Sequence, residues 1–257
     1  MDRRKYINFV TLKRMKEVFL DRLRDMGITT HIIAGNHDTF FRNTNDVNSV
    51  DLLLQEYPNV HMVYAAPEEV VVDGFAVLLV PWITTQNREV TEKIVRESRA
   101  RLCLGHFEFR GFELSRGQKS EHGDEAVDYE KFEAVYSGHF HQPSTRDNVT
   151  YLGAPYEMTW SDAECWRGFH VFDTDTRTLT EIRNPHRLFH RVDYDDSDLT
   201  ADQVSSIDVS RLARTYVKLR VVNKTNPYLL DLLVSKIQSV GPVDLKVIEE
   251  RELQMLE

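Results

Sequence analysis

Apolar and polar residues recur along this chain with two different spacings. Between Leu12 and Met26, apolar residues occur every three or four positions and Gly27 follows them, which predicts an amphipathic helix that ends at this glycine. The β-branched run at 28–34 comes next and predicts a buried strand that ends at Gly35. A helix followed directly by a strand is typical of α/β layering, so we expect an α/β fold.

The same two spacings predict the elements that follow. The patterns indicate helices at 47–57, 89–100 and 127–134, strands at 101–109 and 135–143, and hairpins at 70–82 and 168–184. The first hairpin should turn at Asp73-Gly74, a pair that tolerates the positive φ angles of a tight turn.

An acidic segment separates these elements from the C-terminal part of the chain. Residues 193–203 are rich in aspartate and predict a loop or linker. Beyond it, a strand at 215–222, a helix at 226–241 and a strand at 243–250 form a βαβ pattern. We therefore expect a main domain over residues 1–186 and a small α/β domain over residues 187–257.

Composition narrows the classes of protein that need considering. The 257 residues include 32 Lys and Arg against 41 Asp and Glu, a net charge of −9, which argues against a uniformly basic coat for nucleic acid. An acidic protein can still bind phosphate where metal ions neutralise it locally. Only two cysteines occur, and no run of 18 apolar residues is present, so we expect a cytoplasmic protein without disulfides.

Three apolar segments break at a glycine and then present histidine. They are Gly-Asn-His-Asp at 35–38, Gly-His at 105–106 and Gly-His-Phe-His at 138–141. The carboxyl ends of strands in an α/β sheet meet at one crevice, so residues far apart in sequence can converge there. We expect that convergence for His37, His106, His139 and His141, the last two on one face of a regular strand.

Each of these turns could also have a purely structural role in the fold. A single histidine after glycine is more often a hydrogen-bonded loop residue than a ligand, but three such turns in one chain favour a site. Imidazole, amide and carboxylate groups together suit manganese, iron or zinc. Cys103 is expected to fill the core. Three aromatic residues beside His106 are also expected in the core rather than on a base-stacking ledge: Phe107, Phe109 and Phe112.

The order of these motifs resembles that of the calcineurin-like metallophosphoesterase family. The segments "HIIAGNHDTFFRN", "LCLGHFEFRGF" and "YLGAPYEMTW" more narrowly resemble the SbcD-type and T-even phage recombination nuclease subunits, from Asp2 to about Arg191. The resemblance implies a β-sandwich flanked by helices in four layers, α/β/β/α, followed by a small cap domain. It also implies a DNA nuclease of a bacterial or phage-infected cell, homodimeric and acting with an SMC-like ATPase.

The resemblance also implies a role for each motif residue. Two divalent metal ions, manganese above all, would stabilise the attacking and leaving oxygens of a phosphodiester. By this resemblance Asn36, His106 and His139 bind one ion and His141 binds the second. His37 would stabilise the phosphoryl group or protonate the leaving oxygen, and Asp38 would orient His37.

Two motifs of the family are not found in their usual form. No D-x-H occurs, and Asp2 resembles only the last aspartate of G-D-x-x-D, as a residue behind the metal site. Gly123-Asp124 follows the other motifs in the wrong order and is not accepted as a replacement. We therefore expect the first strand and three ligands to be missing, the metal site of His141 to be incomplete, and catalysis to be impaired.

Three alternatives remain open on the sequence alone. They are another metallophosphatase, a non-catalytic subunit that binds DNA or the ATPase, and an unrelated α/β protein with incidental histidines. Exonuclease or endonuclease action, the native metal and the oligomeric state are not determined by these motifs.

Overall fold

The computed structural model describes residues 6–115 and 117–249, and the chain forms two compact units. The first unit runs up to Ala154 and also contains His170–Glu181. The second contains Pro155–Phe169 and the chain from Ile182 onward. The second unit thus includes a segment, 155–169, that precedes the boundary expected at residue 187.

The first unit begins with one long helical segment. It consists of α1 (Phe9–Met15), a π-helical turn at Lys16–Leu20, and α2 (Asp21–Asp25). The helix predicted for 12–26 is therefore confirmed, but it starts earlier because the Asn8 side chain accepts the N–H groups of Val10 and Thr11.

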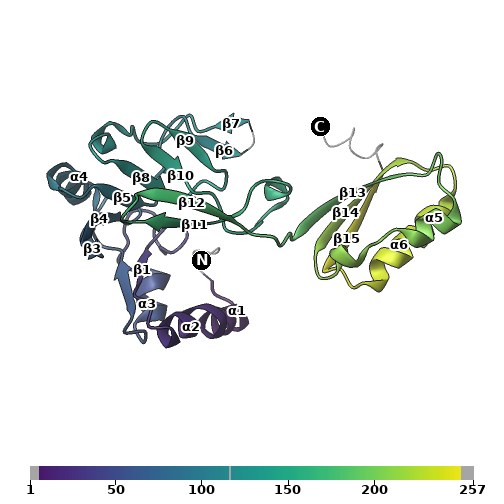
Figure 1. The fold of residues 1–257 in the computed structure, drawn as a ribbon, viewed down its shortest axis with the longest axis horizontal. Helices are drawn as coiled ribbons and strands as arrows, with labels where there is room; N and C mark the ends of the chain where they lie inside the picture. Colours follow the sequence, from purple (N-terminus) through teal and green to yellow (C-terminus); the bar gives the residue numbers. More distant parts are fainter. Residues whose placement is uncertain (1–5, 116, 250–257) are drawn as a thin grey trace. The chain divides into compact units, whose positions relative to one another are not determined.

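A small parallel sheet follows this helix. Strand β1 (Thr30–Ile33) pairs in parallel with β2 (Val60–Val63), and α3 (Ser49–Leu54) lies between them in sequence. The face of this sheet toward the helices is covered by one apolar cluster, in which Leu20 and Leu54 pack with Val60. Burial of this cluster holds the N-terminal helices against β1 and β2; Figure 1 shows α1, α2 and α3 near β1.

A six-stranded mixed sheet forms the centre of the first unit, in the order β3-β4-β5-β8-β10-β9. The neighbours from β4 to β10 are parallel, and the strands at both edges are antiparallel. The predicted turn at Asp73-Gly74 is confirmed, with φ angles of 50° and 80°. The strands are β3 (Glu68–Val72), β4 (Phe75–Val80), β5 (Leu102–Gly105), β8 (Ala134–Ser137), β9 (Ser144–Arg146) and β10 (Val149–Tyr151).

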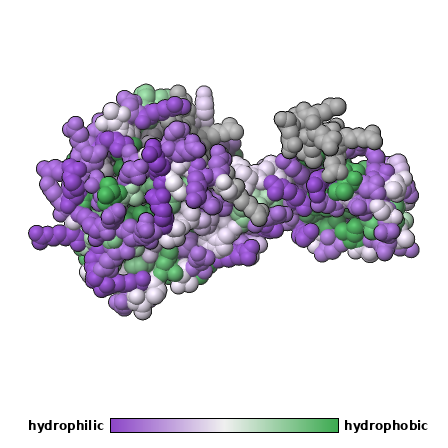
Figure 2. Space-filling view, turned by 90° about the horizontal axis from the view of Figure 1, so that it is seen from above, coloured by the Kyte–Doolittle hydropathy of each residue, from purple (hydrophilic) through white to green (hydrophobic). Residues whose placement is uncertain are grey.

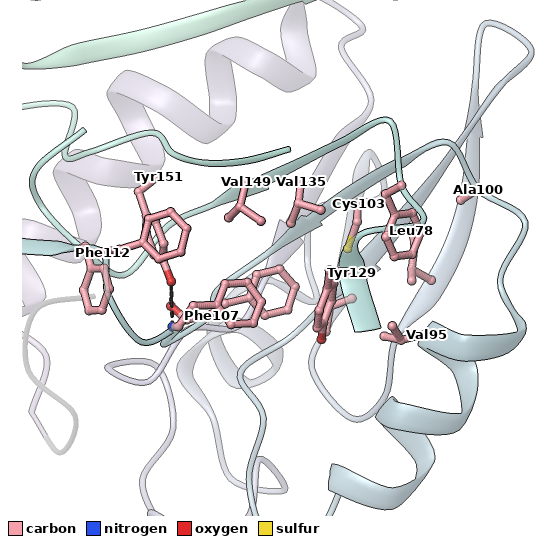
Figure 3. Packing of buried hydrophobic residues seen from close by; sticks show 14 residues of the cluster. Leu78, Val95, Ala100, Cys103, Phe107, Phe112, Tyr129, Val135, Val149 and Tyr151 are labelled. Atoms are coloured by element: carbon pink, nitrogen blue, oxygen red, sulfur yellow. Dashed lines mark hydrogen bonds between the residues drawn. The ribbon is translucent and has the colours of Figure 1, made fainter. Parts of the chain in front are cut away.

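Residues of β4 alternate between two apolar clusters, one on each face of the large sheet. Val77 and Leu79 pack with Val63 of the small sheet. Leu78 and Val80 point the other way, into the cluster that contains helix α4 (Arg88–Glu97) and that is drawn in Figure 3. Helices, small sheet, large sheet and α4 therefore form successive layers, and the predicted α/β class is confirmed.

Two short elements complete the first unit. Strands β6 (Glu113–Ser115) and β7 (Gln118–Lys119) form a small hairpin. The helix predicted for 127–134 is wrong, since only a 3₁₀ turn forms at Val127–Tyr129. The Asn148 side chain donates to the carbonyl groups of Tyr129 and Phe132, at 2.9 and 2.8 Å, and so holds this segment as a turn.

The second unit is a three-stranded parallel sheet covered by helices. Strands β13 (Phe189–Asp195), β14 (Tyr216–Asn223) and β15 (Asp244–Glu249) are adjacent in that order, and α6 (Pro227–Ser239) is the crossover between the last two. The predicted βαβ pattern is confirmed. Its core joins alternate residues of β14 to one face of α6: Val217, Leu219, Val221, Leu229, Leu233 and Ile237.

The acidic segment at 193–203 does not form the predicted linker. Strand β13 continues to Asp195, and helix α5 (Ala201–Ser206) begins inside the segment. Thr200 and Gln203 form a capping box at the start of α5, in which each side chain bonds the backbone N–H of the other residue. The capping box therefore starts a helix in a segment whose aspartate-rich composition predicts a loop.

Hairpin β11 (Gly168–Asp173) and β12 (Thr178–Arg183) forms at the predicted place, 168–184. The face of the molecule drawn in Figure 2 is largely hydrophilic, with apolar residues in small patches. In the part of the chain that the structure describes, no helix is long and apolar enough to cross a membrane.

Candidate functional site

Strand ends of the two sheets in the first unit meet at one place. The backbone N–H of Trp82, just after β4, donates to the carbonyl of Ala34, just after β1, at 2.8 Å. The N–H of Gly138 donates to the carbonyl of Gly105 at 3.0 Å and joins the ends of β8 and β5. The three glycine-histidine segments therefore start from one edge, as the sequence predicts.

Asn36 and two histidines come into contact at this edge. Nε2 of His106 lies 3.0 Å from Oδ1 of Asn36. The ring centroids of His106 and His139 are 5.2 Å apart in an edge-to-face arrangement. Residues 70 and 33 positions apart in sequence are thus neighbours, because strand pairing brings their segments together.

Glycine is required where the backbone passes the His106 ring. A Cβ atom at Gly35 would lie 2.8 Å from Cε1 of His106, and one at Gly138 would lie 3.0 Å from its Nδ1. Both distances are too short for a side chain to fit without displacement of the ring. The two glycines therefore allow the segments of Asn36 and His139 to close around His106.

The Asp38 carboxylate helps to fold its own loop. Its Oδ2 accepts the backbone N–H of Gly35 at 2.9 Å, and its Oδ1 accepts the hydroxyl of Ser49 at 3.1 Å. His37 precedes it and is exposed, and it lies close enough to His106 and His139 to contribute to lowering the pKa of both. His37 thus lies on the open side of the cluster.

The segment of His139 and His141 is not a regular strand. Strand β8 ends at Ser137, and His139 has a φ angle of 84°, so alternation along a strand does not place these two histidines. Their predicted position on one face of a strand is wrong for this reason. The His141 side chain is partly buried and lies close enough to His139 to contribute to lowering the pKa of His139.

The Ser137 hydroxyl joins the two histidine segments. It accepts the N–H of Phe107 at 3.0 Å and donates to the carbonyl of Gly138 at 2.9 Å. Ser137 is fully buried, so these bonds are shielded from water. Movement of the His106 segment is thereby coupled to the backbone just before His139.

A buried tyrosine fixes the backbone after His106. The Tyr151 hydroxyl accepts the N–H of Phe109 at 2.9 Å and donates to the carbonyl of Phe107 at 3.1 Å; Figure 3 shows Tyr151 beside Phe107. The predicted core positions are confirmed for Phe107, Phe109 and Phe112, which are buried, and for Cys103, whose thiol pKa is raised by burial. The His106 segment therefore rests on a rigid aromatic base.

Both central imidazoles are held in their neutral form. Burial, and then His139, lower the pKa of His106 to about 3, against a smaller opposing effect of Asp38. Burial, and then His37 and His141, lower the pKa of His139 to about 4. A neutral imidazole keeps a nitrogen lone pair that can bind a metal ion or accept a proton.

The donors in this cluster match a metal site only in part. Imidazole nitrogens and the Asn36 amide oxygen suit manganese, iron or zinc. Yet over residues 6–115 and 117–249, no three His, Cys, Asp or Glu side chains come close enough to hold an ion. Asp2 lies outside the described residues. The described cluster therefore offers part of a ligand shell.

Three further residues border the cluster and were not predicted as site residues. The Trp82 ring lies 5.9 Å from that of His106 and 5.3 Å from that of His139, between centroids. Arg88 and Asp124 line a cavity of about 200 Å³ beside His106. For Trp82, the sequence offered one signal: the hairpin predicted at 70–82 ends with this residue, at the same edge of the sheet as the histidine segments.

Comparison with known proteins places this geometry in context. No family model matches the chain. Exonuclease subunit 1 of Enterobacteria phage T4 is 35% identical over 271 aligned residues, which cover 99% of this chain and 76% of the phage protein. The chain therefore belongs to the family of the phage T4 exonuclease subunit 1.

Proposed function

We propose that this chain is the nuclease subunit of a phage recombination or repair complex, and that it hydrolyses phosphodiester bonds of DNA. One observation carries the proposal: Asn36, His106 and His139 are brought together from three strand ends at one edge. The similarity to a phage exonuclease subunit supports DNA as the substrate. An SMC-like ATPase and a second copy of the chain are its proposed partners.

Two divalent metal ions, preferably manganese, are the proposed cofactors, in a calcineurin-like metallophosphoesterase arrangement. Asn36, His106 and His139 would hold one ion and His141 would take part in the second site. The neutral state of His106 and His139 fits this role because a protonated imidazole cannot bind a metal. When bound, the ions supply charge neutralisation at the phosphate.

The protein groups have separate tasks in this proposal. His37 is exposed at the open side of the cluster, where it can reach a leaving oxygen and give it a proton. Asp38 holds the loop of His37 through Gly35 and Ser49. The rigid segments of His106 and His139 keep the donors in place before the substrate arrives.

Binding without catalysis is the second candidate function. It is favoured by the partial ligand shell that residues 6–115 and 117–249 provide. In that case the chain would bind DNA or the ATPase through the same fold. DNA binding that weakens steeply with salt, without cleavage, would support it.

One comparison of substrates and variants tests these readings. Purified chain is incubated with manganese and either linear duplex DNA or a phosphomonoester dye. The nuclease reading predicts DNA cleavage that is lost in His37→Ala and kept in His61→Ala, a histidine of β2 that bonds Glu68. Hydrolysis of the dye alone would favour a phosphatase, and DNA binding without cleavage would favour the second candidate.

A further inference from the structure

A cavity of about 200 Å³ opens beside His106. Drug-sized ligands occupy pockets of roughly 300 Å³ or more, so this cavity suits a single ring system rather than a longer segment of chain. Its lining combines aromatic rings, among them that of Trp82, with charged and polar side chains. The lining groups that matter for recognition are Trp82, Ile83, Arg88, His106, Glu108 and Asp124.

The charges of this lining disfavour a phosphate group. Arg88 contributes one positive charge, while Glu108 and Asp124 contribute two negative charges, so these three side chains sum to 1 − 2 = −1. Both carboxylate oxygens of Asp124 accept from Nη1 of Arg88, at 3.1 Å each. This pairing offsets the positive charge of Arg88 and leaves the cavity better suited to an uncharged, hydrogen-bonding ring.

Trp82 is held in position for stacking. Its backbone N–H is bonded to Ala34, and its ring packs against the imidazoles of His106 and His139. Phe107 and Phe109 also line the cavity; both are buried, and their rings stack with centroids 4.8 Å apart. An aromatic side chain fixed in this way can stack on a nucleobase of any identity.

We propose that this cavity binds the nucleobase next to the scissile phosphate, with Trp82 stacking on the base and the Arg88–Asp124 pair at its polar edge. The inference rests on the proposed nuclease function and adds a base subsite to it. Since His106 lines both the cavity and the metal-type cluster, a base in the cavity places its own phosphate beside that cluster. Trp82 would then select unstacked, single-stranded ends over intact duplex.

Binding of a fluorescent base provides the first test. Short single-stranded oligonucleotides carrying 2-aminopurine at either end or internally are titrated with the full chain. Quenching should saturate with wild type, and Trp82→Leu should weaken binding about tenfold because one base–aromatic stack is lost. Phe9→Leu, which removes an exposed aromatic ring of α1, should bind like wild type.

An abasic substitution provides the second test. A series of DNA substrates is prepared, each with one abasic site at a different distance from the cleaved bond. For the wild-type chain, the abasic site at one of these positions should raise KM about tenfold. In Trp82→Leu the same abasic site should change KM less than twofold, because ring and base act as a pair. Equal losses in wild type and variant would overturn the proposal, as would displacement of the probe by inorganic phosphate at low millimolar concentration.

The two proposals fail in different ways. Cleavage by Trp82→Leu at the wild-type KM would remove the base subsite and leave the nuclease function standing. If the chain quenches the probe in a Trp82-dependent way but never cleaves DNA, the base subsite is supported and the nuclease function is contradicted. A wild-type chain that neither quenches the probe nor cleaves DNA would overturn both.

Discussion

The carboxyl edges of the parallel strands in the two units are used in opposite ways. In the first unit this edge presents Asn36, His106 and His139 to one another across short distances. In the second unit the polar residue after β13, Asp196, is buried and accepts the backbone N–H groups of Thr225 and Asn226 and the hydroxyl of Tyr194. The carboxyl edge of the sheet thus carries a candidate site in the first unit. In the second unit it carries the hydrogen bonds that Asp196 accepts, which stabilise the fold.

The difference follows from what precedes the polar groups. Glycines at the first edge leave space for side chains of neighbouring segments, as Gly35 does for His106. At the second edge the carboxylate is saturated by donors of its own unit. Substitutions at the first edge should therefore affect chemistry more than stability, and substitutions at the second edge should do the reverse.

The largest expected effect is that of His37→Ala on turnover. Loss of a group that protonates the leaving oxygen should lower kcat about 10²- to 10⁴-fold. His37 is exposed, so the thermal midpoint should stay within about a degree of wild type. A large drop in the midpoint, measured by calorimetry alongside kcat, would contradict the separation of chemistry from stability at this edge.

Gly35→Ala tests the close approach around His106. The added Cβ would meet the His106 ring at 2.8 Å, and such overpacking should cost about 1–3 kcal/mol of unfolding free energy. It should also move the ring away from Asn36 and reduce activity. Gly138→Ala, whose nearest ring atom is 3.0 Å away, should show a smaller change in urea unfolding. Equal stability for Gly35→Ala and wild type would mean that the ring moves freely.

Tyr151→Phe tests the backbone support of the His106 segment. Removal of one hydroxyl leaves the N–H of Phe109 and the carbonyl of Phe107 without this partner, which should cost about 1–3 kcal/mol. Amide exchange at Phe109 should accelerate, whereas exchange in β14 of the second unit should not. Unchanged exchange at Phe109 would show that the tyrosine does not hold this segment.

Asp196 should show its effect only at acid pH. Burial alone would raise the pKa of Asp196, but the N–H groups of Thr225 and Asn226 and the Tyr194 hydroxyl outweigh it and lower the pKa to about 2. The folded state then binds the proton more weakly than the unfolded state, where an Asp has a pKa of about 3.9. The ionised Asp196 carboxylate therefore contributes to the unfolding free energy above that pKa, and this contribution is lost as the pH falls toward 2.

The corresponding measurement compares wild type with Asp196→Asn between about pH 4 and pH 2. Stability of the second unit, followed by urea unfolding, should fall more steeply with decreasing pH in wild type than in the variant. If the unfolding free energies of wild type and variant fall in parallel as the pH decreases, other carboxylates account for the acid sensitivity. The hydrogen bonds to Asp196 would then not stabilise the carboxyl edge of the second unit.

The sequence predicts those features whose signals are local. The turn at Asp73-Gly74 and the helix that ends before Gly27 depend on neighbouring residues, and both are present. The meeting of the glycine-histidine segments was also predictable, because parallel strands share an edge. The capping box at Thr200 was a local signal too, but the surrounding aspartates concealed it.

Features that depend on distant partners were not predictable. Trp82, Arg88 and Asp124 join the site only after β4, α4 and the 123–124 turn are assembled around His106. The φ angle of 84° at His139 results from the path that the backbone takes after β8, not from the identity of the residue. The number and position of ligands in a site therefore require the tertiary structure.

The bond from the Trp82 N–H to the Ala34 carbonyl has a mechanical consequence. It crosses from the large sheet to the small one, and the candidate donors are divided in the same way, with Asn36 following the small sheet and His106 and His139 following the large sheet. Any shear of one layer past the other would strain this bond before it separated the donors. The site should therefore loosen only when the two layers slip as a whole.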